Sequence, residues 1–176
     1  MMIERYKINQ DQKKRIWKWL QSNNIANRGE FDGDKEKQLV GLIGEFEVHN
    51  YLLGYYPEFK KGFDGGVDII YKDKTIDVKT MGRNVDCQMH YVNNFVASQL
   101  KYDCDVIIFV SVNKKDNTFS ICGWIEKNNL QRKSILYEKG EKRQRDDGTF
   151  FKCEADMYEI FNYNLIDMKW LKNKNK

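Results

Sequence analysis

The chain has 176 residues, of which 41% are hydrophobic, and its formal net charge is +4. This length supports one domain with a substantial core and is too short for two. The small excess of positive charge permits a polyanionic partner without requiring one. No stretch approaches the roughly 18 apolar residues of a membrane span, and the first residues lack the apolar core of a signal peptide. We therefore expect a single domain with no membrane partner.

Cysteine usage indicates a reducing compartment. The four cysteines are widely spaced and form no C-x-x-C pair; they are Cys87, Cys104, Cys122 and Cys153. With only two histidines in the chain, a structural zinc site is not expected. Reduced thiols in a cytosolic protein are the better interpretation.

A basic helix is expected near the N-terminus. Residues Gln10 to Gln21 place apolar side chains on one stripe and lysine and arginine outside it. The basic face is interpreted as solvated, with a nucleic-acid contact as the alternative. We assign residues 1–33 to an N-terminal helix and loop, and residues 34–176 to the core with a C-terminal extension, within one compact domain.

A second helix is expected to begin after Asp34, a suitable N-cap, and to run to about Gly54. Gly41 and Gly44 each cost about 1 kcal/mol relative to alanine inside a helix. Two such residues around Glu45 indicate that this helix packs closely on a sheet. Close packing would let the glutamate reach the strands that follow.

Residues Gly66 to Lys79 alternate apolar and polar side chains, which predicts two strands joined by a turn at Lys72-Asp73. This register places Asp68 opposite Asp77, with Lys79 on the same face. Two carboxylates and an ammonium are costly to hold on a half-buried face without a counter-ion, and a divalent metal is the simplest explanation. The alternative is an exposed charged face whose ion pairs contribute about 0–1 kcal/mol.

The rest of the chain is expected to contain one fully buried strand. Thr80–Asn84 reads as a loop beside the hairpin. Val106 to Val112 is a near-continuous apolar run, typical of a strand buried on both faces, and Thr118 to Ile125 is the returning strand. A short helix is predicted for residues Glu126 to Leu130. Gln131–Gly148 has many basic and few apolar residues, which predicts an exposed basic loop.

Three features together resemble the PD-(D/E)XK nuclease superfamily. They are the triplet Asp77-Val78-Lys79, Asp68 upstream on the matching face, and the helix sequence Gly-Leu-Ile-Gly-Glu45. The chain has three other D/E-x-K triplets, but only this one lies on an alternating strand. The resemblance covers Gln38 to Val112 in the order of elements, and the tail looks similar to extensions in phage and mobile-element endonucleases.

The resemblance implies an α/β fold with a restriction-endonuclease-like core, in which a central mixed β-sheet is flanked by helices. It implies that Asp68, Asp77 and the backbone carbonyl of Val78 bind Mg²⁺ or Mn²⁺, ions that suit hard oxygen ligands. Glu45 would complete the metal shell directly or through a water. Lys79 would orient or deprotonate the attacking water and stabilise charge on the phosphorane.

The implied function is a metal-dependent DNA endonuclease, that is, a Mg²⁺-dependent deoxyribonuclease, in the cytoplasm of a bacterial or phage-infected cell. One alternative is a structure-specific junction resolvase, which would act as a homodimer. Another is a non-catalytic nucleic-acid-binding module on the same fold. DNA contacts are predicted for one residue beside the site and for three in the basic loop, namely Arg83, Lys142, Arg143 and Arg145. The alternative for the loop is a solvated segment kept charged for solubility.

Overall fold

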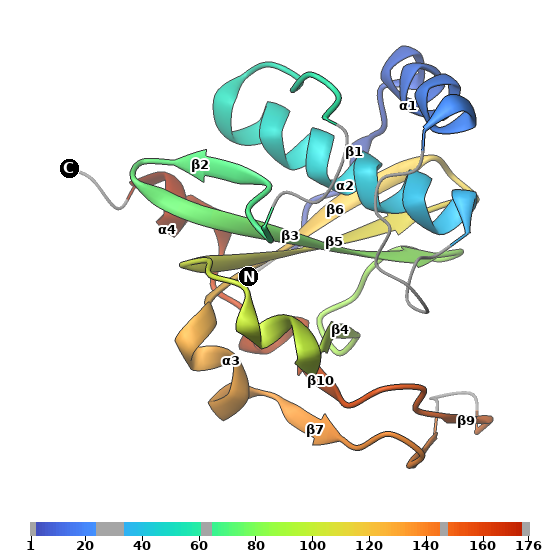
Figure 1. The fold of residues 1–176 in the computed structure, drawn as a ribbon, viewed down its shortest axis with the longest axis vertical. Coiled ribbons are helices and arrows are strands. Elements are labelled where there is room, and N and C mark those ends of the chain that lie inside the picture. Colours follow the sequence, from blue (N-terminus) through green and yellow to red (C-terminus); the bar gives the residue numbers. More distant parts are fainter. Residues whose placement is uncertain (1–2, 24–33, 61–64, 145–147, 174–176) are drawn as a thin grey trace.

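A computed structural model describes residues 3–23, 34–60, 65–144 and 148–173 (Figure 1). Its centre is a five-stranded sheet with the strand order β1-β6-β5-β3-β2. The strands are β1 (Tyr6–Lys7), β2 (Ile69–Tyr71), β3 (Lys74–Arg83), β5 (Val106–Asn113) and β6 (Thr118–Glu126). β3 and β5 run parallel, whereas the other neighbours run antiparallel. The predicted mixed central sheet is confirmed.

Two layers cover the two faces of this sheet (Figure 1). On one face lie α1 (Gln10–Ser22) and α2 (Lys35–Leu53). On the other lie α3 (Lys127–Lys133) and a three-stranded antiparallel sheet of β4 (Val92–Val96), β10 (Met157–Phe161) and β7 (Ile135–Tyr137). The remaining elements are η1 (Ala97–Lys101), β8 (Lys142–Gln144), β9 (Phe150–Lys152), η2 (Asn162–Asn164) and α4 (Met168–Asn173). None of the described helices is both long and apolar enough to cross a bilayer.

β5 carries the core, because all of its residues are buried. Ile108 and Val110 pack in the cluster beneath α1 and α2. Ile107 and Phe109 pack in the second cluster, against the three-stranded sheet and α3. The prediction of a strand buried on both faces is therefore confirmed, and this one strand joins both layers into a single compact α/β domain.

The two helices on the upper layer begin and end close to the predicted positions. Asn9 caps α1, and the Asp34 side chain accepts a hydrogen bond from the Lys37 N–H at the start of α2. Gly54 ends α2 in the left-handed conformation, with φ of 83°. Ile16 of α1 is buried in the same cluster as α2. The N-terminal helix is thus part of the common core.

Only one of the two glycines in α2 makes the predicted close approach. A Cβ atom on Gly44 would lie 1.9 Å from the Thr80 Oγ1 of β3, and 2.9 Å from the Thr80 Cβ. A Cβ atom on Gly41 would meet nothing within 4 Å. The prediction was therefore right for Gly44 and wrong for Gly41.

A buried carboxylate that the sequence did not single out joins the two helices. Glu47 of α2 is only 5% exposed. Its Oε1 accepts from the Asn9 backbone N–H at 3.2 Å, and its Oε2 accepts from the Tyr56 hydroxyl at 3.2 Å. Burial raises the pKa of Glu47 above its ordinary value of 4.5, although both hydrogen bonds oppose the shift.

The contribution of Glu47 to the free energy of unfolding should therefore fall as pH rises. Because its folded-state pKa lies above the unfolded value, the folded state holds the proton more tightly, and stability falls as pH rises through this window from about 4.5 upward. In Glu47→Gln the amide keeps both hydrogen-bond partners without charge. We expect its melting temperature, relative to wild type, to increase from pH 4 to pH 7 in thermal unfolding. The exposed control Glu138→Gln should show no such trend, and a constant Glu47→Gln difference would contradict the assignment.

Two predicted loops are wrong. Residues Thr80–Asn84 do not form a loop, because β3 continues to Arg83 and stays paired with β5 up to Asn113. The segment Gln131–Gly148 is not irregular either: it contains the end of α3, all of β7 and all of β8. β7 and β8 are only three residues long and are largely exposed, so neither leaves an alternating pattern long enough to predict a strand.

Candidate functional site

The β2–β3 hairpin is built as predicted. Lys72 and Asp73 have positive φ values of 49° and 59°, which suit a two-residue hairpin turn. The paired residues are Ile69 with Ile76, Ile70 with Thr75 and Tyr71 with Lys74, which is the predicted register. The Asp68 N–H donates at 2.9 Å to the carbonyl of Ile76, the residue already opposite Ile69, so regular pairing ends before Asp68 and Asp77.

Asp77 and Lys79 form a partly buried ion pair on β3. The Lys79 Nζ lies 2.7 Å from the Asp77 Oδ1, and the two side chains are 21% and 8% exposed. The β3–β5 register aligns them with Ile107 and Phe109, so they share the face that turns away from α2. The Lys79 Nζ also lies 5.7 Å from the centre of the Phe95 ring on β4. Taking a charged pair out of water is costly even when the two charges are paired, which favours a functional role.

Asp68 immediately precedes β2 and lies beside the edge of β3. Its Oδ2 accepts from the Val78 backbone N–H at 2.6 Å. In a β-strand the N–H and C=O of one residue point to the same edge. The Val78 carbonyl therefore lies on the edge of β3 that faces Asp68, as a shared ligand set requires.

Glu45 meets the hairpin at Asp68. Both residues line a small cavity of about 90 Å³ between α2 and the chain that follows it, together with His49. The His49 Nδ1 donates to the Tyr55 carbonyl at 2.8 Å, which leaves its Nε2 for another contact. Sequence reasoning missed His49, although its position four residues after Glu45 on one helix face was a usable signal.

The predicted residues do not all gather on one face. Asp77 and Lys79 are in direct contact, and Asp68 and Glu45 share a cavity, but α2 packs on the opposite face of β3, where Gly44 touches Thr80. Within the described ranges, no group of three or more His, Cys, Asp or Glu side chains is arranged to hold a metal ion. Asp68, at the strand edge, accepts from the Val78 N–H between Asp77 and Lys79 and also lines the cavity with Glu45.

Cys104 is a further residue of the site that the sequence did not suggest. Burial raises its pKa to about 11, and the negative charge of Asp77 adds to the shift, while Lys127 and Lys79 oppose it. The thiol is therefore within electrostatic reach of the hairpin charges and stays protonated at neutral pH. It is therefore not a thiolate ligand at neutral pH.

Arg83 lies on the same strand face as Asp77 and Lys79, but its charge is used inside the protein. Its guanidinium donates to the Val92 carbonyl and lies 5.0 Å from the centre of the Tyr91 ring. It also stands near Cys87, whose sulfur is 3.4 Å from the sulfur of Cys122. A hydrogen bond from Cys122 is the main reason that the pKa of Cys87 falls to about 6, and Arg83 adds to the effect.

The basic segment offers fewer phosphate contacts than predicted. Lys142 is exposed on β8. Arg143 instead donates through Nε to the Glu159 carboxylate at 2.8 Å, and the Glu159 side chain is only 3% exposed. The prediction of an exposed basic loop is therefore wrong for Arg143, whose side chain is only 20% exposed. Arg145 lies outside the described residues.

Comparison with known proteins gives no relative from which a role could be transferred. The chain matches no protein-family model, no curated protein and no solved structure. The function of this site is therefore argued from its own residues and their geometry.

Proposed function

We propose that the protein is a metal-dependent nuclease that hydrolyses DNA phosphodiester bonds, built on a restriction-endonuclease-like core. The observation that supports this most is the arrangement around Val78. Asp68 binds its N–H at 2.6 Å, Asp77 precedes it on a buried strand position, and Lys79 follows it in contact with Asp77 at 2.7 Å. A simple surface ion pair would not require a second carboxylate bound to the backbone between its two members.

The donor set fits Mg²⁺ or Mn²⁺. Magnesium is usually held by one or two carboxylates together with substrate phosphates, and it keeps several waters. Asp68 and Asp77, with the Val78 carbonyl, would supply such a partial set, and Glu45 lines the same cavity as Asp68. A site of this kind needs no cluster of three acidic side chains. When bound, the ion would supply Lewis-acid assistance to attack on the phosphorus.

Lys79 is the residue we assign to charge stabilisation. Its ammonium now neutralises Asp77, and a cation on that carboxylate would compete for the same oxygen. A lysine displaced in this way stays on the same strand face, where it can orient the attacking water and stabilise the negative charge that develops on the phosphorane. The Phe95 ring lies beside this ammonium, with 5.7 Å from Nζ to the ring centre.

Cleavage assays on defined DNA test the proposal directly. Wild-type protein is incubated with supercoiled, linear, single-stranded and branched DNA, with Mg²⁺, with Mn²⁺ and with EDTA. We expect metal-dependent cleavage of at least one substrate and its loss in Asp77→Asn. Asp73→Asn is the matched control, because it removes a carboxylate from the same hairpin at an exposed turn position that asparagine tolerates. Cleavage confined to branched DNA by a dimer would identify the resolvase alternative.

Divalent cations should also stabilise the folded protein. A ligand at ten times its dissociation constant that binds only the folded state adds about 1.4 kcal/mol, or roughly 3–6 °C for a chain of this size. We expect this rise in melting temperature with Mg²⁺, Mn²⁺ or Ca²⁺ in wild type and in Asp73→Asn, but not in Asp77→Asn. An equal rise in melting temperature in all three proteins would contradict the assignment of Asp77 as a metal ligand.

A non-catalytic nucleic-acid-binding module is the second candidate. It is favoured by the Asp77–Lys79 pair, which already neutralises the main carboxylate, and by the separation of Glu45 from that pair across β3. DNA binding that persists without any metal-dependent cleavage, across the four substrates above, would support this candidate over the nuclease.

A further inference from the structure

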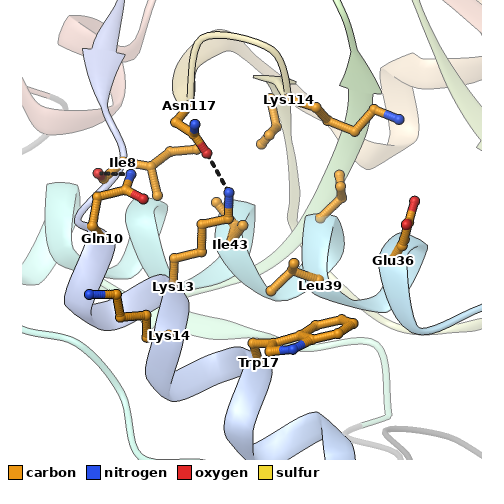
Figure 2. A pocket seen from close by; sticks show the side chains of 12 residues that line it. Ile8, Gln10, Lys13, Lys14, Trp17, Glu36, Leu39, Ile43, Lys114 and Asn117 are labelled. Atoms are coloured by element: carbon orange, nitrogen blue, oxygen red, sulfur yellow. Dashed lines mark hydrogen bonds between the residues drawn. The ribbon is translucent and has the colours of Figure 1, made fainter.

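A groove on the α1–α2 face lies apart from the hairpin site and has its own chemistry. It has a volume of about 410 Å³ and is lined by α1, α2 and the turn between β5 and β6. Figure 2 shows Leu39 and Ile43 of α2 between two walls: Trp17 on α1, and Lys114 with Asn117 on the turn. The groove therefore has an apolar floor with one aromatic wall.

The aromatic wall is accessible. Trp17 is 41% exposed, although it lies on the same helix as the fully buried Leu20. An indole left half-exposed beside an apolar groove provides a flat surface for another ring.

The rim of the groove is cationic. Lys13, Lys14 and Lys114 line it, against a single carboxylate from Glu36. The Lys13 Nζ is bound to the Asn117 side chain, as the dashed line in Figure 2 shows. Lys14 and Lys114 are exposed and project from opposite walls. Lys14 approaches Asp11 only at 3.9 Å, an exposed pair that is worth little.

We propose that this groove binds one unpaired nucleotide of a DNA strand, with the base stacked on Trp17 and the flanking phosphates held by Lys14 and Lys114. Base stacking on an aromatic side chain combined with cationic contacts to the backbone is the general mode of single-strand binding. A duplex base is already stacked and cannot enter. The inference thus names the kind of strand that the protein receives, and in assuming DNA it rests on the proposed function.

The groove adjoins the end of β3, but it opens on the face of the sheet opposite to Asp77 and Lys79. The Lys114 N–H donates to the Arg83 carbonyl at 2.8 Å, so the rim lies beside that strand end. The groove is therefore a binding site separate from the hairpin charges.

Equilibrium binding in Ca²⁺ or EDTA tests the groove without requiring cleavage. The probes are fluorescein-labelled oligothymidine of 12 nucleotides and a 12-base-pair duplex, followed by anisotropy. We expect Trp17→Leu to weaken single-strand binding about tenfold or more. The affinity of this variant for the duplex should stay within about twofold of wild type. Lys14→Gln with Lys114→Gln should lower the slope of log K against log salt by about 1.4, or 0.7 per lost contact.

Matched controls separate the groove from general charge and from the nuclease site. Trp170→Leu removes an exposed tryptophan on α4, and Lys18→Gln removes a charge from α1 outside the groove; both should bind like wild type. Asp77→Asn should retain Trp17-dependent binding, so loss of cleavage leaves this inference standing. Melting temperatures confirm that each variant is folded, and the lysine variants carry the test if Trp17→Leu does not fold.

Three outcomes would overturn the inference. The first is unchanged single-strand affinity and salt slope in the Trp17 and lysine variants, even if the protein cleaves DNA. The second is equal weakening of duplex and single-strand binding by Trp17→Leu, which would indicate a backbone contact without stacking. The third is displacement of the oligonucleotide by a polyglutamate peptide at equal charge concentration, which would indicate a groove that selects acidic protein segments.

Discussion

Lys79→Ala is expected to lower the rate of DNA cleavage by about 10²–10⁴-fold. Lys79 follows the candidate metal ligand Asp77 by two residues and contacts it at 2.7 Å. Because a charge-stabilising lysine acts mainly in the transition state, DNA affinity in Ca²⁺ should change only severalfold. Single-turnover cleavage at saturating protein gives the rate, and anisotropy in Ca²⁺ gives the affinity.

The chain contains a natural control for this variant. Lys169 also follows an aspartate by two residues, and its Nζ lies 3.6 Å from the Asp167 Oδ2, but it is on α4, and its side chain is 65% exposed. Lys169→Ala should cleave like wild type. Lys79→Gln keeps a hydrogen bond to Asp77. It replaces Lys79→Ala in the assay if the unpaired carboxylate destabilises the alanine variant. Wild-type cleavage by both Lys79 variants would mean that the triplet has no catalytic role.

Gly44→Ala should destabilise the fold by about 1–3 kcal/mol, which corresponds to roughly 2–4 °C in melting temperature for each kcal/mol. The new methyl group would lie 1.9 Å from the Thr80 Oγ1. Rotation of the threonine side chain cannot remove the clash, because the Thr80 Cβ itself would be 2.9 Å away. The strain exceeds the gain of about 1 kcal/mol that alanine brings to a helix.

Gly41→Ala is the matched substitution in the same helix. Its methyl group meets nothing within 4 Å, so the helix-propensity gain should appear as stabilisation of up to about 1 kcal/mol. Thr80→Ala should recover part of the loss in Gly44→Ala, since it removes two of the three clashing atoms. Equal changes in stability for the two glycine variants would show that α2 does not pack against β3 at Gly44.

The local pattern of apolar and polar residues was sufficient to predict the β2–β3 hairpin and the buried strand β5. The alternation in residues 66–79 and the turn residues Lys72-Asp73 predicted the register that pairs Tyr71 with Lys74 and Ile69 with Ile76. The apolar run at β5 predicted burial on both faces. Both features depend on side-chain period and on turn geometry, which are properties of a few neighbouring residues.

Side-chain partners far apart in the sequence were not predictable in the same way. Arg143 looked like an exposed loop charge, but its partner Glu159 is buried on β10. Glu47 looked like an ordinary helix residue, but Asn9 and Tyr56 enclose it. Composition gives the charge of a segment, whereas burial depends on which distant element packs against it.

The sequence by itself determined the α/β class, the two long helices, the hairpin register and the spacing of Asp68, Asp77 and Lys79, because each follows from short-range periodicity and capping. Only the tertiary structure decided that α2 packs on the face of β3 opposite to Asp77 and Lys79, so that Glu45 meets the hairpin at Asp68. The packing of α1 beside α2, also decided only in the tertiary structure, leaves the groove beside Trp17. These relations depend on where contacts such as that between Gly44 and Thr80 hold the helix on the sheet, and contacts between residues 36 positions apart leave no local pattern.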